Sequence, residues 1–382
     1  MGAVRPRFAA LLPLFLAAMG LLAGCRTSQL EQPAPPTADS SLAAILNEAR
    51  RRHRIPAMAA VATRADGILE TATEGIRREG LPDPVIPGSR FHIGSNTKAM
   101  TATVVAKAIE EGKLSWDTTP LAVFPEWEGR IREEYRSITI TDLLTHHAGL
   151  SAYDDTESPE FSELDSLPDD PVEQRREFAL RALGREPAVA PRTKRLYSNG
   201  GFSIAAAMTE RVTGESWESL MLSRLFDPLG IEATFEWPAF DDDRQPWGHF
   251  ESPEENHPHD PHDDFQLPPF LLPAGGVSIA PTDYAKVLQL HLDGLAGKDG
   301  LLLARSIEHL HTPSSDHTAM GWGIQEFEGA VASVHTGSAG TFFAVVTVWP
   351  SRDLAVAVFA NAGGDRAQKA CVEVLKAMAH RY

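Results

Sequence analysis

Three short segments of the chain contain residue types that can carry out nucleophilic catalysis. The first is Ser95-Asn96-Thr97-Lys98, in which a spacing of three residues would place the serine hydroxyl and the lysine amine on one face of a helix. A serine becomes a good nucleophile only when a base takes its proton, and a lysine can be that base when burial lowers its pKa. The start of a helix also offers free N–H groups for an oxyanion. Taken alone, this pattern is more often a capped helix with a surface lysine.

The other two segments contain groups that could position a substrate. Tyr197-Ser198-Asn199 places a phenol, which can relay a proton, next to an amide that can hold a substrate carbonyl or amide. His335-Thr336-Gly337-Ser338 ends a β-like run, and glycines at a strand edge allow an extended substrate to pair with the backbone. Each segment is also common as an ordinary loop or turn, so neither predicts an active site by itself.

Hydrophobic periodicity indicates the elements that would position these segments. Helices are expected over about 41–54, 95–111, 281–292 and 366–380, and 139–230 looks mostly helical around a Pro- and acid-rich loop at 152–171. Strands are expected over 55–64, 68–75, 331–335, 341–349 and 354–361, and 237–273 looks irregular. Strands at both ends with helices between them predict an α/β body carrying an inserted helical part.

In this order, the three motifs resemble those of the serine β-lactamase and penicillin-binding protein superfamily. Further similar segments are 91–95, 138–146 with Gly149-Leu150, 273–276, Gly321-Trp322-Gly323 and Asn361-Ala362-Gly363. The resemblance covers roughly 41–382 and is greatest to the class C-like branch, which includes esterases, D-amino-acid peptidases and carboxypeptidases. It implies an α/β (α+β) β-lactamase/transpeptidase-like fold, with an antiparallel sheet flanked by helices. The body would comprise 41–95 and about 275–382, and the helical part about 96–274.

The resemblance also implies a role for each motif residue. Ser95 would attack a carbonyl and become acylated, Lys98 would accept its proton, and Tyr197 would share the proton relay. Substrate binding would fall to Asn199, His335, Gly337 and Ser338, with the backbone N–H groups of Ser95 and Ser338 forming an oxyanion hole. The expected substrates are small molecules or peptides with an ester or amide bond, including β-lactams and cell-wall-derived peptides. No cofactor or metal is implied.

One departure from the family pattern bears on the substrate. Many relatives have Lys-Thr-Gly as the third motif, where this chain has His335-Thr336-Gly337. Because that lysine is associated with the carboxylate of β-lactams, the substitution favours neutral esters or amides over efficient β-lactam hydrolysis. The alternative function is a non-catalytic penicillin- or peptidoglycan-binding sensor, although such a role would not require the serine, the lysine and the tyrosine together.

The N-terminus is typical of a targeting signal. Arg5 and Arg7 precede an apolar run of 17 residues over 8–24, shorter than the roughly 20 residues that a spanning helix needs. Leu22-Ala23-Gly24-Cys25 resembles the bacterial lipobox, which implies cleavage before Cys25 and lipidation of its thiol. Residues 1–24 are then a signal peptide, 25–40 a tether, and 41–382 an extracytoplasmic domain anchored to a bacterial membrane.

Composition and the remaining clusters narrow the choice of partners. Lys and Arg total 35 against 52 Asp and Glu, a formal charge of -17 that disfavours nucleic-acid binding. The segment His257–Asp264 could bind a divalent metal, although a solvated acidic surface is the commoner meaning of such a pattern. Four aromatic residues flank it and could roof the substrate cleft or pack the loop: Trp237, Trp247, Phe250 and Phe265.

Overall fold

The structure, a computed structural model, describes residues 41–154, 161, 164, 166–314 and 316–382. The predicted signal peptide, Cys25 and the tether lie outside this part of the chain. No helix among the described residues is both long enough and apolar enough to cross a bilayer.

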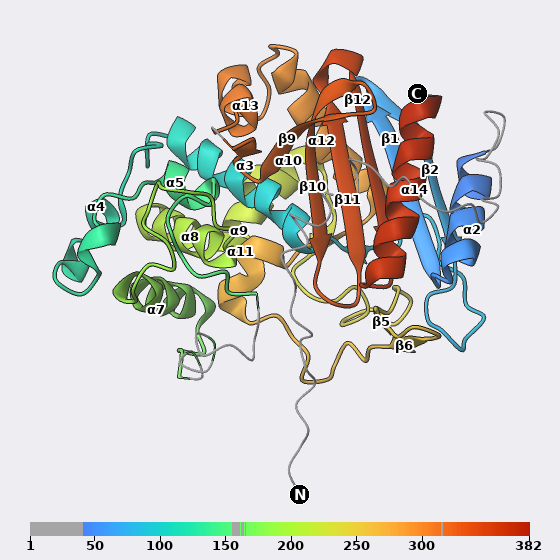
Figure 1. Ribbon diagram of the computed structural model, residues 1–382, viewed down its shortest axis with the longest axis horizontal. Coiled ribbons are helices and arrows are strands. Elements are labelled where there is room, and N and C mark those ends of the chain that lie inside the picture. The colour runs from blue at the N-terminus through green and yellow to red at the C-terminus, as the bar shows by residue number, and fades with distance from the viewer. Residues whose placement is uncertain (1–40, 155–160, 162–163, 165, 315) are drawn as a thin grey trace, which may run out of the picture.

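A seven-stranded antiparallel sheet forms the centre of the molecule, in the order β2-β1-β12-β11-β10-β9-β8 (Figure 1). Its strands are β1 (Ala57–Arg64), β2 (Gly67–Gly75), β8 (Thr318–Ala319), β9 (Trp322–Phe327), β10 (Ala330–Ser338), β11 (Phe343–Trp349) and β12 (Leu354–Ala360). The hairpin near the start of the described chain completes this sheet by pairing β1 with β12, for example Met58 with Ala360. The predicted antiparallel sheet built from both ends of the chain is confirmed.

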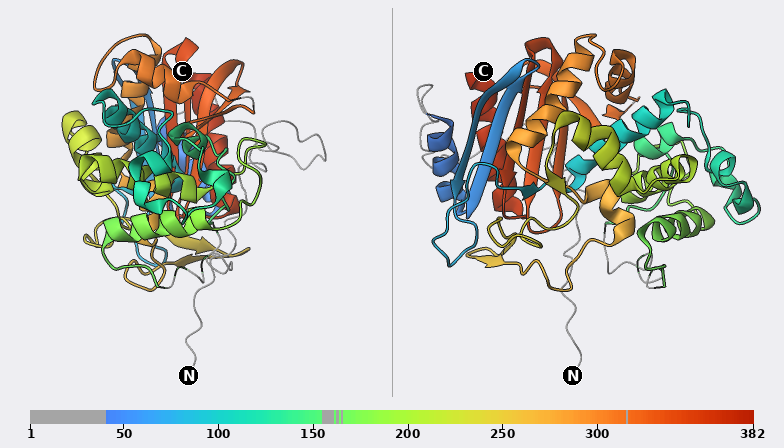
Figure 2. Two further views of the ribbon diagram at one scale, coloured as in Figure 1. Left: turned by 90° about the vertical axis from the view of Figure 1, so that its left-hand side faces the viewer. Right: turned by 180° about the vertical axis from the view of Figure 1, so that it is seen from behind.

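Both faces of the sheet are covered, which explains why its central strands are apolar throughout. Along β12, Val356 and Val358 belong to one hydrophobic core, whereas Ala357 and Phe359 belong to the other. Helices α2 (Leu42–His53) and α14 (Asp365–Arg381) pack together on the first face, and α12 (Pro281–Leu295) lies on the second. Figure 2 shows these layers from two further directions. Alternating side chains therefore enter separate cores, as expected for a strand buried on both sides.

The helical part lies beside the sheet, on the side away from α2 and α14 (Figures 1 and 2). Its central element is α3 (Thr97–Glu110), which contacts α8, α11 and α13 and has almost every residue buried. The surrounding helices are α4 (Pro120–Val123), α5 (Ile140–Leu144), α7 (Pro171–Gly184), α8 (Asn199–Thr213), α9 (Trp217–Met221), α10 (Asp227–Leu229), α11 (Leu272–Gly275) and α13 (Ala304–His311). Helix α3 thus lies at the junction between the sheet and the helical part.

A small second sheet joins the segment before Ser95 to the segment after Gly276. It has the order β3 (Phe91–His92), β7 (Ser278–Ile279), β4 (Ala233–Thr234). Ile93 N also donates to Val277 O at 2.9 Å. These bonds hold the 273–276 segment against the start of α3.

Three features were not expected from the sequence. The segment predicted to be irregular contains the hairpin β5 (His249–Glu251) and β6 (Asn256–Pro258), so the range 96–274 is not wholly helical or coil. Strand β9 and helix α13 were also missed. Strand β9 is only partly buried between its ends, so its alternation is weak. Helix α13 has its apolar residues on one face, but it is only 8 residues long and they are few.

Candidate active site

The serine and lysine of the first motif lie in direct contact at the start of α3. Ser95 sits in the 3₁₀ turn η1 (Gly94–Asn96), and Lys98 lies in the first turn of the helix that follows. Lys98 Nζ is 3.0 Å from Ser95 Oγ. The sequence prediction that these two groups share one face is therefore met.

Lys98 is fully buried, and its surroundings favour the neutral amine. Nζ donates to Asn199 Oδ1 and to the Ala274 carbonyl, both at 2.7 Å. Burial lowers the pKa of Lys98 well below its usual value, and the charge of Asp154 partly opposes this. A neutral amine has two hydrogens and one lone pair, and both hydrogens are used by the amide and carbonyl oxygens. The lone pair is then left facing the Ser95 hydroxyl, the arrangement that a general base requires.

Tyr197 completes the contact with the nucleophile. Its hydroxyl donates to Ser95 Oγ at 2.8 Å. Burial raises the pKa of Tyr197 above its usual value, so the phenol keeps its proton. Ser95 can accept from Tyr197 and donate to the lone pair of Lys98 at once. The three groups form one proton-transfer chain.

Asn199 begins helix α8 and connects the lysine to the opposite wall of the site. Besides accepting from Lys98, it donates from Nδ2 to the Tyr153 carbonyl at 2.9 Å. Its side-chain orientation is therefore defined by two bonds. The predicted grouping of Ser95, Lys98, Tyr197 and Asn199 occurs in the structure.

The end of strand β10 passes directly beside the serine turn. A Cβ on Gly337 would lie 2.0 Å from Ile93 O and 2.7 Å from Ser95 N, so only glycine fits there. Residues 335–338 pair with β11, whereas pairing with β9 ends at Val334. This edge of β10 is thus open beside Ser95, and Ser338 lines the pocket there.

His335 is buried beside the same site and is neutral. Burial, with a smaller contribution from the charge of Lys98, lowers the pKa of His335 to about 3. Its Nδ1 lies 2.7 Å from the Thr336 carbonyl, so this nitrogen carries the hydrogen and Nε2 is the acceptor. A permanent positive charge, as a lysine would supply, is absent at position 335.

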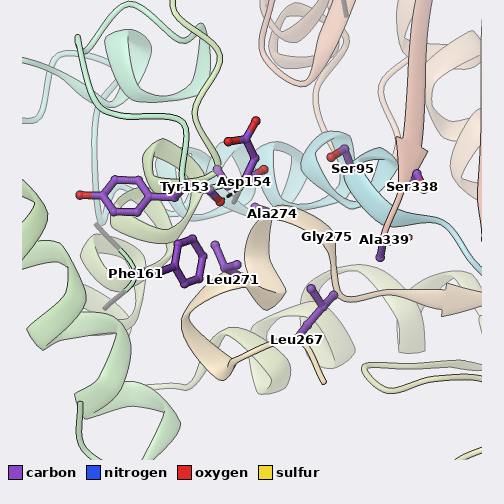
Figure 3. Close-up of a pocket in the computed structure, with 11 residues that line it drawn as sticks. Ser95, Tyr153, Asp154, Phe161, Leu267, Leu271, Ala274, Gly275, Ser338 and Ala339 are labelled. Atoms are coloured by element: carbon purple, nitrogen blue, oxygen red, sulfur yellow. Dashed lines mark hydrogen bonds between the residues drawn. The ribbon is translucent and has the colours of Figure 1, made fainter. Parts of the chain in front are cut away.

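A pocket of about 440 Å³, partly open to solvent, lies in front of Ser95. Figure 3 shows Tyr153, Phe161 and Leu271 on one side, Ser95, Ser338 and Ala339 on the other, and Asp154, Ala274, Gly275 and Leu267 between them. The wall is mostly apolar. A substrate with a hydrophobic group next to its scissile carbonyl fits this lining.

Sequence reasoning missed three residues that help to build the site. Asp154 lies in the predicted acidic loop, but nothing in the sequence distinguishes it from the loop's other carboxylates. His146 packs against Tyr197, with ring centroids 4.5 Å apart and the rings tilted by 36°, and accepts from Ser198 N. His146 and Ala274 lie in the segments 138–146 and 273–276 that resemble the family, but the sequence analysis assigned them no role, and the contribution of Ala274 comes from its backbone carbonyl.

The clusters set aside in the sequence are not among the residues that line this pocket. No group of three metal-binding side chains occurs in the described part of the chain, which includes residues 257–264. Of the flanking aromatics, Trp237 and Phe265 are buried against each other and do not line the pocket. The structure therefore favours packing of the loop over a roof on the cleft.

Comparisons with known proteins agree with this architecture. The β-lactamase family model matches residues 42–377. Penicillin-binding protein 4 of Amycolatopsis lactamdurans is 28% identical over 331 residues, 82% of this chain and 83% of the relative. The unguisins hydrolase ungD' of Aspergillus campestris is 25% identical over 357 residues, 85% of this chain and 61% of that protein.

A solved structure supports the fold separately. The octameric penicillin-binding protein homologue from Pyrococcus abyssi superimposes with a TM-score of 0.72 at 21% identity, covering 89% of this chain and 77% of the other. The chain belongs to the β-lactamase family, and it is a serine hydrolase of the superfamily of serine β-lactamases and penicillin-binding proteins.

Proposed function

We propose that this chain cleaves an ester or amide bond through an acyl-enzyme on Ser95. The observation that carries the proposal is the bonding of Lys98, whose two amine hydrogens are held by Asn199 and Ala274 while its lone pair faces Ser95 Oγ. A merely structural lysine would not need to be buried, neutral and directed at a hydroxyl.

The steps follow from this arrangement. Ser95 Oγ attacks the carbonyl carbon while its proton passes to Lys98 Nζ, and the oxyanion accepts from the N–H groups of Ser95 and Ser338. The bond to the leaving group then breaks. Tyr197 donates a proton to the departing atom and regains one from Lys98. Water then attacks the acyl carbon while its proton passes to the same relay. The bond between the acyl carbon and Ser95 Oγ breaks, Oγ takes the proton back from the relay, and the acid product leaves.

The test is covalent labelling with a fluorophosphonate, followed by mass measurement and an ester hydrolysis assay. The natural protein should gain one adduct at Ser95, and Ser95→Ala should lose both labelling and turnover. Ser223→Ala, an exposed serine on the far end of the helical part, is the matched control and should behave as the natural protein. Labelling of the Ser95→Ala variant would overturn the assignment of Ser95 as the nucleophile. Labelling of the natural protein without turnover of any substrate would favour the alternative function, a non-catalytic sensor.

We also propose that the domain is attached to a bacterial membrane through a lipid on Cys25, with residues 26–40 as a tether. The support is the lipobox-like sequence alone. Cys25→Ser should move the protein from the membrane fraction to the soluble fraction or leave its signal uncleaved. Unchanged membrane fractionation would contradict the anchor.

A further inference from the structure

One histidine beside the site has a backbone conformation that usually belongs to glycine. Helix α5 ends in a Schellman turn, in which His146 N donates to Leu143 O at 3.4 Å. The next residue, His147, donates from its N to Asp142 O at 2.8 Å. The central residue of such a turn is left-handed, and His146 has a φ of 62°. Glycine and asparagine adopt this conformation most readily, so a histidine here points to a role for its side chain.

Both the backbone and the ring of His146 hold the segment that carries Tyr197. On one side of the tyrosine, Leu196 N donates to the His146 carbonyl at 2.9 Å. On the other side, Ser198 N donates to His146 Nδ1 at 3.2 Å. The imidazole also packs against the phenol ring, with the centroids 4.5 Å apart. One residue thus contacts Tyr197 and both of its neighbours in the chain.

The bond from Ser198 requires a neutral imidazole, because Nδ1 must offer its lone pair. His146 is buried, and burial is the largest cause that lowers its pKa well below the usual value. The charge of Arg195 adds to this shift. The ring is therefore neutral at neutral pH, with its hydrogen on Nε2.

The position of the Tyr197 hydroxyl matters for one step in particular. The hydroxyl lies 2.8 Å from Ser95 Oγ, and in the proposed mechanism it donates a proton to the departing atom. Proton transfer depends on hydrogen-bond distance and alignment, so a small rotation of the phenol would slow this step. A leaving group that is stable as an anion needs the proton least.

We propose that His146 is a positioning residue that holds Tyr197 where it can protonate the leaving group. Its contribution then depends on the substrate. Alkyl esters and amides release strongly basic groups and need the oriented phenol, whereas nitrophenyl esters need it less. The inference rests on the proposed acyl-enzyme function and names a residue that orients its proton relay.

The first test compares two esters that form the same acyl-enzyme. Methyl butyrate releases a strongly basic alkoxide and p-nitrophenyl butyrate a stable anion, so the ratio of their kcat/KM values reports protonation of the leaving group. His146→Gly keeps the left-handed turn and removes the ring. It should lower kcat/KM about tenfold more for methyl butyrate, part of the roughly 10²–10⁴ that a general acid contributes. Tyr197→Phe should change the ratio further in the same direction.

Two other variants separate positioning from a general structural effect. His146→Asn suits the same turn and offers Ser198 N an acceptor without the ring, so it should change the ratio only about threefold. His317 is an exposed histidine with a φ of 63°, and His317→Gly, the matched control, should leave the ratio unchanged. Equal losses for the two esters, or no loss, overturn the inference. If His146→Gly does not fold in a urea titration, the ratio in His146→Asn decides.

The second test measures labelling of Ser95 and needs no turnover. The p-nitrophenyl and phenyl esters of one alkylphosphonate place the same group on Ser95 and differ in how much the leaving group needs a proton. His146→Gly should slow labelling by the phenyl ester about threefold more than labelling by the p-nitrophenyl ester. An unchanged ratio of the two rates contradicts the inference while leaving the Ser95 mechanism intact. Failure of these esters and of fluorophosphonate to label Ser95 in the natural protein would instead overturn the proposed function, and the inference with it.

Discussion

Lys98 and His335 show how burial decides the chemistry of individual residues at this site. Both are basic side chains that would be charged or half charged in water. Burial is the largest cause of the lowered pKa in each case, and it favours the neutral form of both side chains. The site therefore has a proton acceptor, Lys98, next to the nucleophile Ser95. It has no fixed positive charge at position 335.

A residue-scale prediction follows for substrate charge. Because His335 is neutral, short-chain p-nitrophenyl esters should be hydrolysed faster than the anionic β-lactam nitrocefin. His335→Lys should narrow this gap about fivefold, the value of a salt bridge of about 1 kcal/mol with the substrate carboxylate. The measurement is kcat/KM for both substrates from pH 5.5 to 8.5.

The exposed His257→Lys is the control for the added charge and should leave the ratio of the two kcat/KM values as it is. If the natural enzyme already hydrolyses nitrocefin as fast as the esters at pH 8, a neutral His335 is no barrier to β-lactams.

At the scale of elements, a buried ion cluster joins three helices behind the pocket. Arg175 of α7 is fully buried and bonds Glu210 of α8 at 2.6 Å and Glu218 of α9 at 2.9 Å. It also donates to the Pro269 carbonyl, just before the pocket residue Leu271. Burial raises the pKa of Glu210 even though Arg175 opposes the shift, so the carboxylate depends on its partner.

Removing the Arg175 side chain should therefore destabilise the helical part. Arg175→Ala would leave the Glu210 carboxylate buried and unpaired, and the free energy of unfolding in urea should fall by about 3–5 kcal/mol. The neighbouring exposed pair of Arg176 with Glu173 is the control, and Arg176→Ala should cost at most about 0.5 kcal/mol.

A double variant separates loss of charge pairing from loss of packing. Arg175→Met with Glu210→Gln removes both charges, and the glutamine can still accept from Trp217 N. It should recover much of the lost stability. A double variant as unstable as Arg175→Ala would show that packing of the arginine stem dominates.

At the scale of the whole molecule, buried neutral histidines connect the layers. Six of them have a lowered pKa because they are buried: His92, His146, His249, His291, His311 and His335. Two of the six form a hydrogen-bonded chain from His291 of α12 through His311 of α13 to Ser333 of β10. Each side chain must charge when the protein unfolds in acid.

Stability should accordingly fall between pH 7 and pH 5. Burial lowers the pKa of His291 to about 4, so the folded state stays neutral while the unfolded state binds a proton below about 6.5. The stabilisation is present above pH 6.5 and is lost as the pH falls towards 4, about 2 kcal/mol per such histidine at pH 5. Urea unfolding at both pH values measures it.

His291→Gln should reduce the difference between the two pH values by about that amount, whereas the exposed His257→Gln should leave it unchanged. An equal pH dependence in the natural protein and in His291→Gln would contradict the role of the buried imidazole.

Much of this architecture could be predicted from the sequence because its signals are local. Alternating or continuous apolar runs indicated β1, β2, β10, β11 and β12, and helical spacing indicated α2, α3, α12 and α14. The Ser95–Lys98, Tyr197–Asn199 and His335–Gly337 segments were recognised because their order along the chain resembles that of the serine β-lactamase and penicillin-binding protein superfamily. The short hairpin β5–β6, strand β9 and helix α13 were not predicted, because each is short and offers few apolar positions from which a pattern could be recognised.

Only the tertiary structure decided the ionisation of the catalytic side chains and the packing of the residues around them. Whether Lys98 is a base depends on Asn199 and on the Ala274 carbonyl, which lie 101 and 176 residues away. Whether Gly337 is essential depends on the approach of Ile93 and Ser95 to a strand near the far end of the chain. The sequence determined which side chains are available for chemistry. Burial and long-range contacts determined their charges and partners, because desolvation and hydrogen-bond geometry arise only when distant segments pack together.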